Sequence, residues 1–81
     1  MEKPIVFWRS ARRHRIGKGH ARHVMQSATP VPVDRTGDLD PQLVWLGPDD
    51  RGVWLEIIAL DLPDCVVVIH VMPLYRRKDR G

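Results

Sequence analysis

The chain has 81 residues, of which 43% are hydrophobic and 28% are charged, and this composition indicates a globular domain and excludes a disordered segment. A single core is barely sufficient to stabilise a chain of this length, so binding to a partner or to further copies would help it. The charged N-terminus and the lack of an apolar run near the roughly 20 residues of a membrane helix predict a soluble cytoplasmic protein without membrane contact.

The charge is distributed unevenly along the chain, whose formal net charge is +3. Residues 1–23 carry seven basic side chains against one acidic, a net charge of +6. Residues 24–75 carry two basic side chains against eight acidic, and residues 76–81 carry four against one. If the two basic ends meet in space, they form one surface that suits a phosphate-rich partner or an acidic protein segment. The alternative is two solvated tails.

The N-terminal part is expected to contain a strand and then helix. The stretch "PIVFW" over residues 4–8 is β-branched and aromatic, which favours a strand. Ser10 offers an N-cap for a helical turn in "ARRHRI", which ends or breaks at a pair of glycines. A better supported helix over residues 21–28 has one narrow apolar face at helical spacing. That face consists of Ala21, Val24, Met25 and Ala28.

Short strands separated by turns follow from residue 31. Residues 31–33 are expected at a sheet edge, because Pro32 has no N–H to donate to a ladder. Loops of four or five residues make the later strands antiparallel neighbours. These later strands are predicted over residues 42–47, 53–60 and 65–72.

The predicted fold class is therefore α+β, as a single domain over residues 1–81. An N-terminal strand and helical segment would pack on one face of an antiparallel β-meander. The basic tail, residues 76–81, is expected to be mobile at its end. Cys65 is the only cysteine and is expected to be a small buried hydrophobe without a disulfide.

Two ionisable side chains interrupt the two most apolar strands. Glu56 is the only charged residue of its strand, and His70 is the only ionisable one of the next strand apart from the Cys65 thiol. An odd number of residues in the connecting loop would place Glu56 and His70 on one sheet face, whereas four would separate them. On one half-buried face they could act as an acid–base pair. The alternative is a solvent-facing glutamate and a hydrogen-bonded core histidine.

Three histidines lie among the basic residues of the N-terminal segment. His20 and His23 are three residues apart, but no cysteine is near and no acidic residue occurs between Glu2 and Asp34. A zinc site needs three or four ligands, so we expect no metal and no other cofactor. His23 is expected to face solvent.

The basic residues are better suited to bind phosphate oxygens. Trp8 and Tyr75 lie next to basic residues and could stack a base, although core filling is the alternative for Trp8. The predicted nucleic-acid-binding residues are Arg9, Arg12, Arg13, Lys18, Arg22, Tyr75, Arg76, Arg77 and Lys78.

The segments "RRHRI", "LVWLGPDDRGVWLEII" and "VVVIHVMPLYRRK" resemble, in order, the elements of BrnT-like toxins of the RelE-like ribonuclease superfamily. Arg13, His14 and Ile16 stand at the K-H-x-V positions of that group. Leu46-Gly47 and Arg51-Gly52 stand at its G…RG hairpin, and residues 76–78 stand at its basic end. The chain departs from the group where Ile69-His70-Val71-Met72 replaces I-S-A-R, and where Arg15 replaces a glycine.

The resemblance implies a RelE-like fold and the toxin of a toxin–antitoxin pair, an RNA endonuclease that needs no metal. Its implied partners are RNA and a cognate antitoxin, in a homodimer or a toxin–antitoxin hetero-oligomer. We expect His70 or Glu56 to act as the base, His14 as the acid, and Arg13 and Arg76 as phosphate clamps. The alternative is a non-catalytic nucleic-acid- or protein-binding module of the same fold, and a third reading is a subunit with a role only in assembly.

Overall fold

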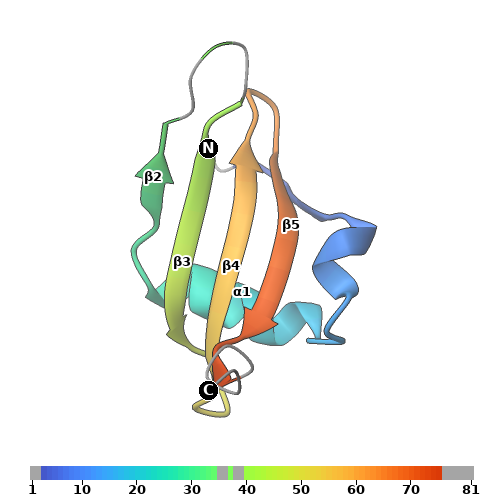
Figure 1. Ribbon diagram of the computed structural model, residues 1–81, viewed down its shortest axis with the longest axis vertical. Coiled ribbons are helices and arrows are strands. Elements are labelled where there is room, and N and C mark those ends of the chain that lie inside the picture. The colour runs from blue at the N-terminus through green and yellow to red at the C-terminus, as the bar shows by residue number, and fades with distance from the viewer. Residues whose placement is uncertain (1–2, 35–36, 38–39, 76–81) are drawn as a thin grey trace.

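The computed structural model describes residues 3–34, 37 and 40–75 and has an α+β architecture. A five-stranded sheet, with the strand order β1-β5-β4-β3-β2, carries the helix α1 on one face, behind the strands in the view of Figure 1. The elements in chain order are β1 (Ile5–Phe7), the 3₁₀ turn η1 (Arg9–Arg12), α1 (Lys18–Ser27), β2 (Val31–Val33), β3 (Gln42–Pro48), β4 (Trp54–Asp61) and β5 (Val66–Pro73).

The antiparallel meander predicted from the short loops is confirmed. β3 pairs with β4 and β4 with β5, both antiparallel. β2 lies at the edge beside β3, as Pro32 required. β1 forms the other edge and runs parallel to β5, with Ile5 opposite Val66, so the sheet as a whole is mixed.

The core lies between α1 and the sheet. Ala21 and Val24 are fully buried, and Met25 and Ala28 pack at the border of the same cluster, so the predicted apolar helix face is confirmed. Helix and sheet approach closely at Gly47, where an added Cβ would lie 3.2 Å from the Ala28 Cβ. The absence of a side chain at this position lets the helix lie against β3.

The prediction that Ser10 caps a helix is wrong. Residues 9–12 form a 3₁₀ turn with Trp8 at its N-cap, and no side chain caps it. The Ser10 hydroxyl instead donates to the Ile69 carbonyl at 2.7 Å. β1 ends at Phe7, which leaves that carbonyl beyond the paired part of β5, and a backbone acceptor at a sheet edge needs a donor.

Other expectations have mixed outcomes. Cys65 is partly exposed and not buried as predicted, because it lies in the loop that precedes β5. Among the described residues, no helix is long and apolar enough to cross a membrane. The mobile tail predicted over residues 76–81, and with it the meeting of the two basic ends, lies outside the described residues.

Candidate active site

The direction of His70 is set by a β-bulge in β5. Ala59 of β4 pairs with Val68, but Ile58 pairs with His70, so Ile69 is an extra residue on the β5 side. An extra residue turns every later side chain of a strand to the opposite face. Without the bulge, the pairing that starts with Asp61 opposite Val66 would continue along the strand. His70 would then pair with Ile57 and point into the core.

The bulge therefore overturns the rule that a four-residue loop separates Glu56 from His70. The loop does have four residues, since Asp61 pairs with Val66, yet Glu56 and His70 lie on the same face. This face is the one opposite α1, toward the viewer in Figure 1, and we call it the open face. His70 Nε2 lies 3.2 Å from Glu56 Oε1.

His14 joins this pair from outside the sheet. The His14 and His70 rings meet edge to face, with centroids 6.4 Å apart and an interplanar angle of 83°. The three side chains proposed for acid–base chemistry thus lie together, although they come from three separate segments. His70 and Glu56 are half-buried, with 31% and 19% of their side chains exposed.

The segment that carries His14 is held against the edge of β5. Trp8 N–H donates to the Val68 carbonyl at 2.9 Å, and the Ser10 hydroxyl donates to the next carbonyl, that of Ile69. The chain turns at Arg15, whose φ of +58° is left-handed. The same contacts that continue the edge of the sheet therefore support the bulge and position His14.

This arrangement is suited to proton transfer. With Glu56 ionised, His70 Nε2–H donates to the carboxylate, so the Nδ1 lone pair is the one that accepts a proton. A carboxylate that orients an imidazole in this way also stabilises the imidazolium once it forms. His14 supplies a second imidazole, and an imidazole can act as acid or base near neutral pH.

Part of the predicted basic set lies on the segment that carries His14. Trp8, Arg9, Ser10 and Arg13 line an open surface depression beside η1. Trp8 is 50% exposed, so the alternative that it fills the core is wrong. It follows directly on the edge strand β1, where the chain leaves the sheet, and this position explains its exposure.

The remaining predicted nucleic-acid-binding residues that the structure describes do not line this depression. Lys18 and Arg22 extend over the Phe7 ring, 5.7 and 5.6 Å from its centroid. Arg12 is exposed on η1, and Tyr75 is exposed after β5. Arg76, Arg77 and Lys78 lie outside the described residues.

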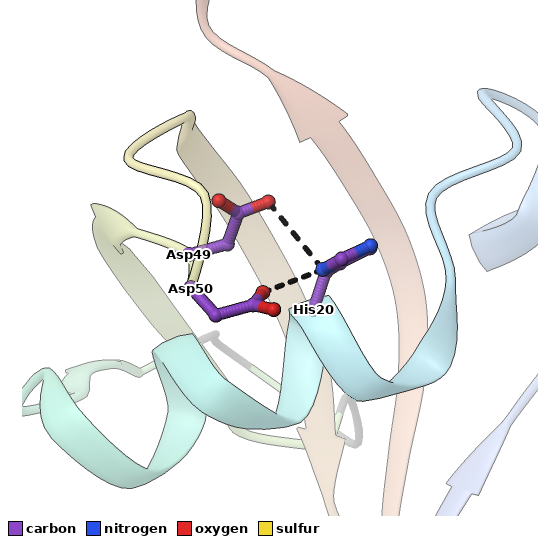
Figure 2. Close-up of side chains that lie close together, drawn as sticks. All are labelled: His20, Asp49 and Asp50. Atoms are coloured by element: carbon purple, nitrogen blue, oxygen red, sulfur yellow. Dashed lines mark hydrogen bonds and ion pairs between the residues drawn. The ribbon is translucent and has the colours of Figure 1, made fainter.

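Sequence reasoning missed a second cluster, which Figure 2 shows between α1 and the β3–β4 hairpin. His20 Nδ1 lies 2.5 Å from Asp50 Oδ1 and 3.9 Å from Asp49 Oδ2. The metal argument assumed that no carboxylate lies near His20, and this premise is wrong. The hairpin brings two aspartates to the helix although they lie about thirty residues from His20 in the sequence. Metal-site motifs with short, fixed spacing do not include residues so far apart.

Asp49 is already fully engaged within the hairpin. Its Oδ1 accepts the backbone N–H groups of Arg51 and Val53, and its Oδ2 accepts Arg51 Nε and Nη2 at 3.0 and 2.7 Å. Burial raises the pKa of Asp49, but these hydrogen bonds outweigh it and hold the pKa below its ordinary value. The hydrogen bond with His20 likewise lowers the pKa of Asp50.

A cation bound at this cluster would have to displace the Arg51 guanidinium, although the three ligand atoms lie within 4.8 Å of one another. The cluster is therefore best described as a brace between the hairpin and α1.

In comparisons with known proteins, no family model, no curated protein and no solved structure matches this chain. The functional assignment consequently depends on the chemistry of the site described above.

Proposed function

We propose that the chain is a toxin-like RNA endonuclease that works without a metal and uses His14, Glu56 and His70 for proton transfer. The observation that carries this proposal is the convergence of two imidazoles and a carboxylate on one half-buried site. Arg9 and Arg13, on the segment that carries His14, supply positive charge for a phosphate. A RelE-like fold, a cognate antitoxin and a cytoplasmic location belong to the same proposal.

The proposed reaction is a transesterification within the RNA. His70, oriented by Glu56, accepts the proton of a ribose 2′-OH, and the 2′ oxygen attacks the adjacent phosphorus. The bond from phosphorus to the 5′ oxygen breaks, and His14 donates a proton to that oxygen. Arg13 stabilises the charge on the phosphorane. The products are a 2′,3′-cyclic phosphate and a 5′ hydroxyl.

The test is cleavage of single-stranded RNA by the purified chain in excess chelator. His70→Gln and His14→Gln should each lower the cleavage rate by about 10²-fold or more, since a lost general acid or base has effects of that size. His23→Gln, which changes an exposed histidine on α1, is the matched control. Wild-type rates in both site variants would refute the proposal. In growing cells, His70→Gln should also lose toxicity.

A non-catalytic RNA-binding module is the second candidate, because Trp8 is exposed beside Arg9 and Arg13 in an open depression. An exposed aromatic next to arginines suits the stacking of an unpaired base. In this case Trp8→Ala should weaken RNA binding, while His70→Gln should leave both binding and the intact RNA unchanged.

A further inference from the structure

The open face of the sheet is almost entirely apolar. Among the described strand residues that point to this side, only Gln42, Glu56 and His70 are polar. The described part of the chain has seven large hydrophobic side chains that are exposed, and five of them lie here. These five are Val6, Val31, Val33, Leu46 and Trp54.

Such a face differs from the usual solvent side of a sheet. An antiparallel sheet with one face in water normally alternates apolar and polar residues along its strands. Here the register sets Val31, Val44 and Ile58 side by side across β2, β3 and β4, and their neighbours are mostly apolar as well. Contiguous exposed apolar surface of this kind marks an interaction site.

We propose that a second copy of this chain covers the open face, so that two sheets pack as a sandwich about a two-fold axis. The charge of the face favours this occupant. Its described strand residues include no lysine or arginine, so it offers no cation for the phosphates of a nucleic acid. It carries one carboxylate and one imidazole, Glu56 and His70, and a second copy brings the same two groups, as a self-complementary interface requires.

The size and shape of the face agree with this occupant. β3, β4 and β5 have seven or eight residues, and β1 and β2 have three each. At about 3.3 Å per residue and 4.8 Å between strands, the five strands present roughly 450 Å² of face per copy. Two copies would then cover about 900 Å², close to the roughly 1,000 Å² that a specific interface needs. Equally twisted sheets stack well on one another, at about −30°.

The dimer also bears on the proposed active site, and this part of the inference depends on the proposed function. Glu56 lies between Leu46 and Met72 on the open face, so a copy packed there covers the Glu56–His70 pair. In the proposed dimer the Glu56–His70 pair is therefore covered, and RNA reaches the pair only in the monomer.

The decisive measurement is the mass of the full chain in solution by light scattering and sedimentation over a concentration series, without RNA. We expect a reversible shift from the 9.3 kDa chain to twice that mass. Leu46→Lys should raise the dimer dissociation constant at least about tenfold, because each ammonium group must lose its water in the interface. The fold should survive, because the new lysine stands opposite Glu56 across β3 and β4.

Gln26→Lys is the matched control, since it adds the same charge on an exposed position of α1, and it should leave the dissociation constant unchanged. Val31→Lys, at an exposed edge position, replaces the first variant if circular dichroism shows that variant to be unfolded. A wild-type chain that stays monomeric at sub-millimolar concentration would overturn the proposal, whether the face then proves to bind RNA or another protein. A dimer that resists both lysine substitutions would overturn it too.

Discussion

One extra residue, Ile69, decides which way His70 faces. Its carbonyl accepts the Ser10 hydroxyl, so the bulge is tied to the segment that brings His14 to the site. Ser10 touches none of the proposed reacting groups in the described contacts and acts as a positioning residue. Its one hydrogen bond links the residue before His70 to the segment that carries His14.

We predict that Ser10→Ala loosens the site without unfolding the domain. Removal of one such hydrogen bond should lower the free energy of unfolding by about 1 kcal/mol. The His70 ring resonances should shift in an NMR titration, and RNA cleavage should fall by roughly tenfold, the change expected from a misplaced imidazole. Ser10→Thr keeps the hydroxyl and should restore both readouts. Unchanged His70 resonances in the alanine variant would show that the bond does not position this ring.

At the scale of elements, the β3–β4 hairpin is held by Asp49. The carboxylate binds two backbone N–H groups and the Arg51 side chain, and its neighbour Asp50 contacts His20 on α1. The hairpin and the start of the helix therefore form one braced unit (Figure 2).

We predict that Asp49→Ala lowers the free energy of unfolding by about 1–3 kcal/mol at pH 7, because it leaves part-buried donors unpaired. The folded state lowers the pKa of Asp49, so the carboxylate stabilises the fold above its unfolded-state pKa of about 3.9. This contribution is lost as the pH falls through the lower folded value. Urea unfolding at pH 7 and pH 3 should therefore show a weaker acid dependence in Asp49→Ala than in wild type. Asp64→Ala, at an exposed position, should behave like wild type.

The contact between α1 and β3 at Gly47 supports another prediction. A Cβ there would lie 3.2 Å from the Ala28 Cβ and 3.6 Å from Val24 Cγ1, so a valine has no room unless the helix moves. Gly47→Val should lower the free energy of unfolding by about 1–3 kcal/mol, the usual effect of overpacking. Gly19→Ala, with nothing within 4 Å, should instead stabilise α1 slightly. Equal unfolding midpoints for the two variants would contradict this view of the contact.

At the scale of the whole molecule, positive and apolar surfaces are separated. The arginines around η1 lie beyond the β5 edge of the sheet, and the open face carries only the Glu56–His70 pair as ionisable groups among its described strand residues. An RNA strand would thus bind along the basic edge and reach the open face only at His14 and His70. Under the two proposals, RNA binding and self-association would use different surfaces that meet at the Glu56–His70 pair.

The affinity for single-stranded RNA should consequently fall as salt rises. Each phosphate contact contributes a slope of about −0.7 to the logarithm of affinity against the logarithm of salt concentration. The double variant Arg9→Ala and Arg13→Ala should make that slope about 1.4 less steep, as fluorescence anisotropy can measure. Lys3→Ala is the control, because Lys3 is engaged with Asp61 and should leave the slope unchanged. Identical slopes for the wild type and the double variant would place the RNA elsewhere.

The sequence by itself determined the elements whose signals are local. Apolar runs bounded by turn residues predicted β3, β4 and β5, the short loops predicted their antiparallel pairing, and helical spacing predicted the buried face of α1. Each of these signals lies within one segment or in the loop that joins two of them. Glu56, His70 and His14 were also recognisable as candidates from residue type alone, because ionisable groups stand out in apolar strands and basic runs.

Only the tertiary structure decided how these residues meet. The carbonyl of the bulged residue Ile69 accepts a hydroxyl donor 59 residues away, and the approach of Asp49 and Asp50 to His20 depends on how the hairpin packs against α1. Neither leaves a trace in local periodicity. Hydrogen bonds between distant segments form only after the chain has packed, and a bulge inverts the face of every later residue in its strand. For this reason the sequence determined which side chains were available, and the packed edge of β5 determined which of them share a site.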